Sequence, residues 1–191
     1  MLSFIRQAGA GLRVLLVLTV IAGFAYPAAV YGVGRLVPDK ADGSMLEVDG
    51  HLVGSLLLGQ AFEGDEWFLP RPSLAGDGYD PLESGGSNLG PNDPGLAKTV
   101  QQRIREVAER EGVSPSQVPA DAVLASWSGL DPHISPQYAA LQVPRVARAR
   151  GFDEDRVLDL VDEATSGRDL GFLGEPRVNV LLLNIALSRL R

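Results

Sequence analysis

The sequence contains no cysteine and only two histidines, His51 and His133. The absence of cysteine excludes disulfides, thiolate metal ligands and cysteine nucleophiles. With so few histidines a metal site would have to be built from carboxylates, so we predict none. Clusters of lysine and arginine are missing as well. The net charge of −7 argues against nucleic acid as a partner, because phosphate backbones are bound by basic patches.

One long stretch lacks charge altogether. Residues 14–34, VLLVLTVIAGFAYPAAVYGVG, contain no charged side chain. A helix of this length, rising about 1.5 Å per residue, spans the roughly 30 Å hydrocarbon core of a bilayer. The sequence therefore predicts four regions, which are a cytoplasmic N-terminus (1–13), a transmembrane helix (14–34), a linker (35–43) and a soluble extracytoplasmic domain (44–191).

The alternative for this N-terminal segment is a cleaved signal peptide. The uncharged run is longer than a usual signal core, and Tyr26 or Pro27 stands where the cleavage enzyme needs a small side chain, which favours retention. Arg6 and Arg13 precede the run, and Arg35 follows it. By the positive-inside rule this small difference favours a cytoplasmic N-terminus and a single-pass protein of the inner membrane.

Two features of the run concern packing. Pro27 removes one backbone hydrogen bond, so we expect a kink or a local contact with a neighbouring helix. Small residues recur at four-residue spacing, Ala25 with Ala29 and Ala28 with Gly32. This spacing lets another helix approach closely, although chance in an alanine-rich segment explains it equally well.

The remaining sequence mixes short strands and helices. Asp49 and Gly50 predict a two-residue hairpin turn. An apolar run at 122–127 is typical of a buried strand, and Pro144 is expected to bend the helix that contains it. Capping and stop residues predict helices from Pro94 to Gly112, from Ser135 to Gly151, over 154–165 and after Pro176. We therefore predict an α+β fold, with one membrane helix followed by one compact mixed domain.

Residue types suited to hydrolytic chemistry lie near one another in the sequence. No G-x-S-x-G motif is present, and residue types alone do not establish a triad. A free-standing, membrane-anchored hydrolase that depends on His133 is the remote alternative. The residues concerned are Ser84, Ser87, Ser126, Ser128, Asp131 and His133.

The glycine-rich stretch SGGSNLGP, residues 84–91, allows two interpretations. It predicts a tight surface loop with positive φ at Gly85 and Gly86. Successive backbone N–H groups without bulky side chains can also form an anion nest for phosphate. The neighbouring GPNDPGLAKT resembles a phosphate loop, but Leu96 stands where the motif requires lysine, so we expect no intrinsic nucleotide hydrolysis.

Seven segments follow one another along the chain: YP, GSLLLGQAF, RPS, GDGYDPLESGGSNLGPNDP, VPADAVLASWSGLDPHISPQYA, QVPRVARARG and VNVLLLNIAL. Taken together and in this order, they resemble the KdpC family, the C subunit of the high-affinity bacterial potassium-transporting P-type ATPase. Two residues depart from the family pattern: Trp127 stands where the family usually has a small residue, and Pro144 interrupts QVxRVA.

The resemblance implies a non-catalytic accessory subunit in membrane lipid. Its implied partners are a potassium-binding, channel-like subunit and an ATP-hydrolysing subunit. It implies no cofactor of its own, with ATP as a nucleotide that it could share with the ATP-hydrolysing subunit. It also implies a proposed activity, in which this subunit raises the ATP affinity of the ATP-hydrolysing subunit.

Two hypotheses follow for the glycine-rich stretch. In the first, SGGSNLGP and SGLDPHISP are rigid docking loops outside the cell. In the second, the protein touches ATP directly through SGGSN, which requires a cytoplasmic domain. The candidate docking or nucleotide-contact residues are Ser84, Gly85, Gly86, Ser87, Asn88, Asp131, His133, Gln142 and Arg145, and those for membrane-helix packing are Ala25, Pro27, Ala29 and Gly32.

Overall fold

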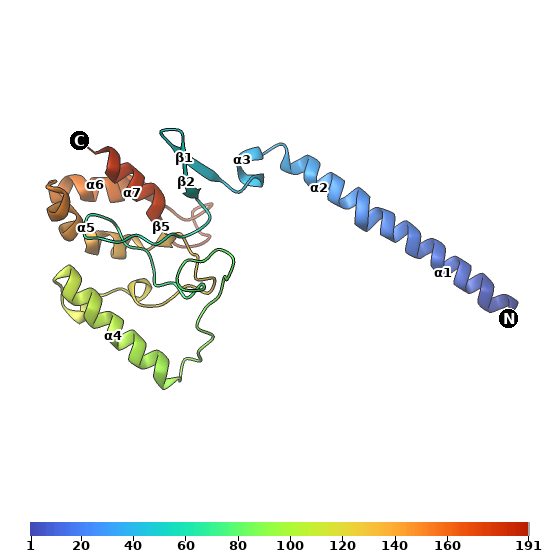
Figure 1. Cartoon of the computed structure of the whole chain (residues 1–191), viewed down its shortest axis with the longest axis horizontal. Helices are drawn as coiled ribbons and strands as arrows, with labels where there is room; N and C mark the ends of the chain where they lie inside the picture. The colour runs from blue at the N-terminus through green and yellow to red at the C-terminus, as the bar shows by residue number, and fades with distance from the viewer. Residues whose placement is uncertain (191) are drawn as a thin grey trace. The chain divides into compact units, whose positions relative to one another are not determined.

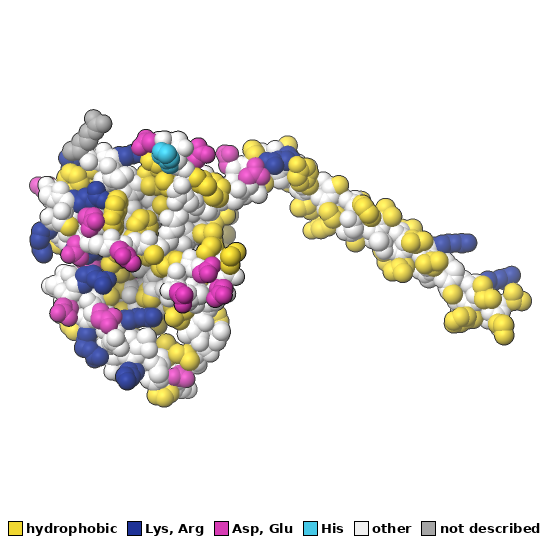
Figure 2. All heavy atoms as spheres, viewed as in Figure 1, with side chains coloured by type: hydrophobic (Ala, Val, Ile, Leu, Met, Phe, Trp, Pro, Cys, Tyr) yellow, Lys and Arg dark blue, Asp and Glu magenta, His cyan; other side chains and the backbone are white. Residues whose placement is uncertain are grey.

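The structure is a computed structural model that describes residues 1–190. The chain divides into two compact units, Met1–Met45 and Leu46–Arg191. The first unit is dominated by one continuous helical run, Leu2–Gly34 (Figure 1), the one helix within residues 1–190 that is long and apolar enough to cross a membrane. Hydrophobic side chains cover this run (Figure 2), and none of its residues is buried within the chain. The run is thus suited to contact with lipid.

The helical run changes to a π-helical turn shortly before Pro27. Proline lacks an N–H, and its ring clashes with the carbonyl four residues earlier. The π-helical turn absorbs the irregularity. The elements of this unit are α1 (Leu2–Val20), η1 (Ile21–Ala25), α2 (Tyr26–Gly34) and α3 (Pro38–Ala41).

Both ends of the predicted membrane segment have regular structure. The helix already begins at Leu2, so the predicted N-terminal region 1–13 is helical. The short helix α3 lies inside the predicted linker 35–43. Arg35 closes this linker by donating two hydrogen bonds, of 3.2 and 2.8 Å, to the carboxylate of Asp42.

Four helices of the second unit begin at capping side chains. Asp93, Ser135 and Asp153 each accept a hydrogen bond from a backbone N–H of the first helical turn, as the sequence predicts, and Asn179 does the same. Glycine in the left-handed conformation ends the first two. The helices are α4 (Pro94–Glu111), α5 (Pro136–Arg150), α6 (Glu154–Ala164) and α7 (Val180–Arg189).

The strands are short and antiparallel. The predicted hairpin forms from β1 (Met45–Val48) and β2 (His51–Ser55), with positive φ at Asp49 and Gly50 in the turn. The second sheet has the order β3-β5-β4, with β5 (Arg177–Asn179) in the centre. Its register pairs His133 with Asn179 and Thr165 with Val178, in β3 (His133–Ile134) and β4 (Thr165–Ser166). The fold class is α+β, as predicted.

Two sequence predictions in this unit are wrong. No strand forms at 122–127, because the N–H groups of Ala122, Val123 and Leu124 bond back to carbonyls of Pro119 and Ala120. The residues form or adjoin a 3₁₀ turn, η3 (Ala120–Ala122), which follows η2 (Pro115–Gln117). The last helix begins at Val180 and not directly after Pro176, because residues 177–179 pair with strands on both sides.

The core of the second unit lies among the last three long helices. α5 packs against α6 and α6 against α7. Phe68, from an extended segment without regular structure, inserts among these helices and is completely buried. Pro144 lies inside α5, and the helix continues on both sides of it. Completely buried side chains from the helices include Val146, Val157, Leu183 and Leu187.

Candidate functional site

The glycine-rich stretch is fixed against residues 126–129. Gly85 donates its N–H to the carbonyl of Ser128 at 2.9 Å, and the Ser84 hydroxyl donates to the same oxygen at 2.9 Å. A Cβ atom on Gly86 would lie 2.9 Å from the carbonyl oxygen of Trp127, so only glycine fits without a shift. The loop therefore owes part of its shape to close backbone contact.

The positive φ angles predicted at Gly85 and Gly86 occur elsewhere. The structure places them at Asn88 (φ 52°) and at Gly129 (φ 68°) in the facing segment. Asparagine tolerates the left-handed conformation better than most residues. Close approach thus explains the glycine at position 86, and the left-handed turns lie at Asn88 and Gly129.

An exposed tryptophan stands beside this loop. Trp127 is 89% exposed and, with Gly86, Ser87 and Asn88, lines a cavity of about 430 Å³ that also reaches Arg103 on α4. Half-exposed leucines extend the apolar area, and exposed apolar groups that gather in this way mark interaction sites. We call this region the loop surface, and it comprises residues 84–91, Leu74, Leu124 and Trp127.

Asp131 and His133 lie together next to the loop surface. The Asp131 carboxylate accepts a hydrogen bond from Arg71 Nη1 at 3.0 Å and from the His133 backbone N–H at 3.0 Å. His133 Nδ1 lies 3.3 Å from the same carboxylate. Within residues 1–190 neither the carboxylate nor the histidine ring is hydrogen-bonded to a serine hydroxyl, so the residues do not form a serine triad here.

The pKa of Asp131 lies below its ordinary value of 3.8. Burial opposes ionisation, but the hydrogen bonds from His133 and the charge of Arg71 outweigh it. A lowered folded-state pKa contributes stability that is present above the unfolded value and is lost as the pH falls through the folded value. Asp131 therefore ties Arg71 and the start of β3 together at neutral pH.

Replacing Asp131 by asparagine is expected to remove this part of the acid sensitivity. Wild type should lose unfolding free energy as the pH falls below about 4, whereas Asp131→Asn should start less stable at pH 7 and show a shallower decline. Urea unfolding of the full chain between about pH 3 and pH 7 measures both. Asp77→Asn, an exposed change, is the control. Equal acid slopes in wild type and Asp131→Asn would contradict the assignment.

Gln142 and Arg145 lie in a buried network and do not line the cavity of the loop surface. The Gln142 amide, which is fully buried, accepts from the Leu69 N–H at 2.7 Å and donates to the Leu69 carbonyl at 3.1 Å. Arg145 Nε pairs with the Glu111 carboxylate at 3.0 Å, and its Nη1 donates to the carbonyls of Asp65 and Trp67. In this conformation both side chains are engaged in holding the extended segment 65–69.

Two further members of this network were missed by sequence reasoning. The Asn184 side chain accepts a hydrogen bond from the Phe68 N–H and donates one to the Phe68 carbonyl, both at 2.9 Å. Gln142 binds the backbone of Leu69 in the same way. An asparagine within the apolar run VNVLLLNIAL is a usable signal for such a buried amide. Glu111 gives no signal, because it ends an exposed and highly charged helix in the sequence.

The four predicted packing residues of the membrane helix are exposed. Ala25, Pro27, Ala29 and Gly32 make no buried contact within the chain, and a Cβ atom on Gly32 would meet no other atom within 4 Å. They are open to a neighbouring helix, and their role in packing stays a prediction. Among residues 1–190 there is also no group of three metal-ligating side chains.

The fold and the site define a class of protein. Its members have a membrane-capable helix and an α+β domain, and the domain carries a fixed loop beside an exposed tryptophan. The sequence matches, over residues 8–189, the family model described as KdpC, K+-transporting ATPase, c chain. The chain belongs to this family of potassium-transporting ATPase subunits.

Individual relatives agree over nearly the whole length. A potassium-transporting ATPase KdpC subunit of Kineococcus radiotolerans is 58% identical over 185 residues, covering 97% of this chain and 94% of the relative. The KdpC subunit of Rhodospirillum rubrum is 52% identical over 90% of this chain and 89% of its own length. That of Geobacter sulfurreducens is 47% identical over 97% and 98%. Membership of the family implies partnership with the other subunits of the ATPase.

Proposed function

We propose that this chain is a non-catalytic accessory subunit whose loop surface docks on the potassium-binding subunit, outside the cytoplasm. Docking would stabilise the assembled complex and raise the ATP affinity of the ATP-hydrolysing subunit. The observation that carries the proposal is the 89% exposure of Trp127 beside a loop whose backbone is already fixed.

A fixed loop suits a docking role for an energetic reason. Binding costs free energy whenever flexible segments must be ordered, and a preformed loop avoids most of this cost. Tryptophan is enriched among the residues that dominate binding energies, because it buries a large rigid surface. The leucines at the edge of the loop surface would exclude water around it.

An effect on ATP affinity must then be indirect. A domain outside the cytoplasm cannot touch cytoplasmic ATP, so the coupling has to pass through the membrane helix or the assembled complex. Such coupling requires that the subunit contact its partners differently in two states of the pump.

Direct nucleotide contact is the second candidate. It is favoured by one observation, that the open face of Trp127 and the guanidinium of Arg103 line the same cavity as Ser87. Stacking on an aromatic ring with a cation nearby is a way to hold a base and its phosphates. Gln142 and Arg145, which the sequence suggested for this role, do not line that cavity.

One labelling experiment separates the two candidates. The chain has no cysteine, so Ser87→Cys gives a single thiol on the exposed part of the loop. We expect a membrane-impermeant maleimide to label it in intact cells that produce this subunit alone. Co-production of the partner subunits should reduce labelling, because docking covers the loop.

Ser116→Cys is the matched control. Ser116 is exposed on η2, outside the loop surface, and should label equally with and without partners. Labelling of both thiols only after the cells are opened would contradict an extracytoplasmic domain and favour nucleotide contact. Undiminished labelling at Ser87→Cys in the assembled complex would contradict docking through the loop.

A further inference from the structure

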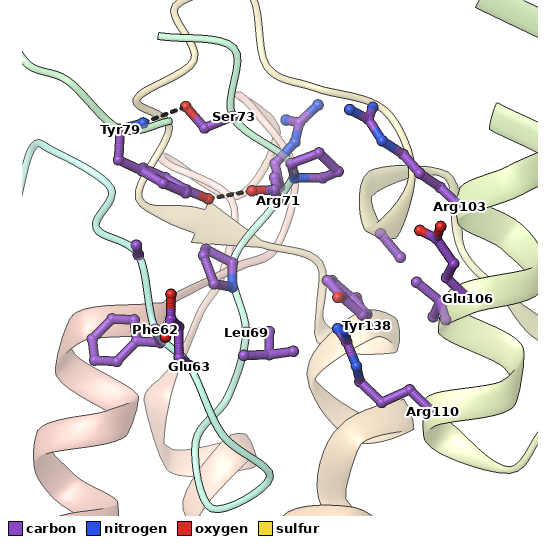
Figure 3. A pocket seen from close by; sticks show the side chains of 15 residues that line it. Phe62, Glu63, Leu69, Arg71, Ser73, Tyr79, Arg103, Glu106, Arg110 and Tyr138 are labelled. Carbon is purple, nitrogen blue, oxygen red and sulfur yellow. Dashed lines mark hydrogen bonds between the residues drawn. The ribbon is translucent and has the colours of Figure 1, made fainter. Parts of the chain in front are cut away.

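A second cavity, of about 320 Å³, lies between α4 and the extended segment 61–73. Figure 3 shows Arg103, Glu106 and Arg110 along α4, across from the segment that carries Glu63 and Leu69. Positions 103, 106, 107 and 110 recur at helical spacing, so one face of α4 forms a wall of the cavity. Tyr138, from α5, completes the lining.

The Tyr138 hydroxyl has no partner. Tyr138 is 3% exposed, and its backbone N–H bonds to Ser135 Oγ, but no group within residues 1–190 is hydrogen-bonded to its hydroxyl. The neighbouring Tyr79 differs, because its hydroxyl donates to the Arg71 carbonyl. The hydroxyl oxygen is not among the fully buried side-chain atoms that lack a partner, so it is accessible from the open space of the cavity that Tyr138 lines. The Tyr138 hydroxyl is therefore a donor that a ligand in this cavity could satisfy.

Tyr138 remains a donor at neutral pH. Burial raises the pKa of its phenol to about 12, and the nearby charge of Glu111 acts in the same direction. The charge of Arg110 lowers this pKa, which reflects its closeness to the phenol. A protonated hydroxyl beside a guanidinium favours an acceptor that carries negative charge.

Two guanidinium groups on the cavity wall have unused donors. Arg110 forms no ion pair and no hydrogen bond within residues 1–190, and Arg103 uses Nη1 for the carbonyl of Val123 at 3.0 Å. Guanidinium groups are donors only, and their forked geometry matches a carboxylate. Figure 3 shows Arg110 next to Tyr138, whereas the guanidinium of Arg103 lies at the other end of the cavity. Tyr138 and Arg110 are therefore the two donors that a single ligand group could contact together.

Two carboxylates at the exposed rim limit what can bind. Glu106 accepts a hydrogen bond from Gln102 at 2.8 Å, and Glu63 makes no ion pair within residues 1–190. Both would repel a phosphate dianion more strongly than a carboxylate with a single charge. Leu69, Pro70 and Val107 provide apolar contact for a short carbon chain. The lining therefore suits a carboxylate on a small apolar body.

We propose that this cavity binds a carboxylate group, held by the Tyr138 hydroxyl and the guanidinium group of Arg110. The carboxylate belongs either to a small organic acid or to an acidic side chain of a partner subunit. This site is separate from the docking role of the loop surface and does not rest on it.

The first arm of the test measures the binding of a free carboxylate to the full chain in detergent. Butyrate, a carboxylate with a single charge, is the probe, and butyramide at equal ionic strength is the neutral reference compound. Side-chain signals of isotope-labelled arginine and tyrosine, followed by NMR, report binding. Tyr138→Phe and Arg110→Gln should each weaken butyrate binding about tenfold, the effect of losing a hydrogen bond to a charged group.

The second arm measures a carboxylate of a partner. The same variants are co-purified with the other subunits, and we expect recovery of the variant chain in the complex to fall about tenfold. Tyr138→Phe should leave the urea midpoint of the isolated chain unchanged, because it removes a hydroxyl that has no partner. A loss in this arm is therefore not misfolding.

Arg105→Gln is the matched control, because Arg105 is exposed on α4 but does not line the cavity. If Tyr138→Phe and Arg110→Gln weaken binding in the first arm, the ligand is a small organic acid. If they reduce recovery of the complex in the second arm only, the ligand is a carboxylate of a partner subunit. The proposal is overturned if both variants match wild type in both arms, or if Arg105→Gln loses as much as Arg110→Gln. The Ser87→Cys labelling experiment tests the docking role of the loop surface independently of the result obtained for this cavity.

Discussion

Arg145→Met should destabilise the second unit by about 3–5 kcal/mol, the usual cost of removing one partner of a buried ion pair. Arg145 is 6% exposed, and the side chain of its partner Glu111 is 1% exposed. The change also removes the hydrogen bonds that Arg145 Nη1 donates to the carbonyls of Asp65 and Trp67. The extended segment that carries Phe68 into the core would lose its anchor.

Chemical unfolding of the full chain in detergent measures this change. Arg148→Met, an exposed change on the same helix, should cost less than about 0.5 kcal/mol. The double variant Glu111→Leu/Arg145→Met should recover much of the loss, because it leaves no unpaired buried charge. Equal midpoints for Arg145→Met and Arg148→Met would show that the network contributes no net stability.

The same pair predicts a pH dependence. Burial raises the pKa of Glu111 above its ordinary value of 4.5, although Arg145 opposes the shift. The folded state then holds this proton more tightly than the unfolded state, so stability falls as the pH rises from 4.5 through the folded value. Without Arg145 the folded value rises further, and the Arg145→Met defect should shrink in acid.

Gly129→Ala should be the second severe change, at about 2–5 kcal/mol. Gly129 has φ 68°, a conformation that costs other residues about 1–2 kcal/mol. Its new Cβ would also lie 2.7 Å from both the Ala75 nitrogen and the Gly85 carbonyl oxygen, where overpacking adds about 1–3 kcal/mol. Because these contacts join the loop surface to its support, the loop surface should lose its shape.

Gly90→Ala is the control for this change. Gly90 belongs to the same loop surface, but its φ is not positive and a Cβ there meets no other atom within 4 Å. It should stay within about 0.5 kcal/mol of wild type. Urea midpoints of the full chain compare the two variants. Similar results for both would remove Gly129 from the supports of the loop surface.

Features encoded within a few residues could be read from the sequence. Asp93, Ser135 and Asp153 identify helix starts because a cap acts on the next turn, and Asp49 with Gly50 identifies a hairpin for the same local reason. The run at 122–127 could not be read in this way. Its apolar composition suits a strand, but within residues 1–190 no strand pairs with it, and the N–H groups of Ala122, Val123 and Leu124 bond to carbonyls of preceding residues.

The candidate site was predictable only in part, for a related reason. The bare backbone of SGGSNLGP pointed to a loop of special shape, but Gly86 is explained by close contact with Trp127, which lies far away in the sequence. Gln142 and Arg145 looked available because their partners, Leu69 and Glu111, are 73 and 34 residues away. A single sequence does not show which distant backbone groups a polar side chain will satisfy.

The π-helical turn before Pro27 affects which side chains of the membrane-capable helix can contact neighbouring helices. Such a turn adds one residue to the helix, which rotates everything beyond it by about 100° relative to an uninterrupted helix. Side chains of α1 and of α2 that sequence spacing would place in one stripe therefore face different directions. A single membrane-spanning helix can in this way present different faces to two neighbouring helices.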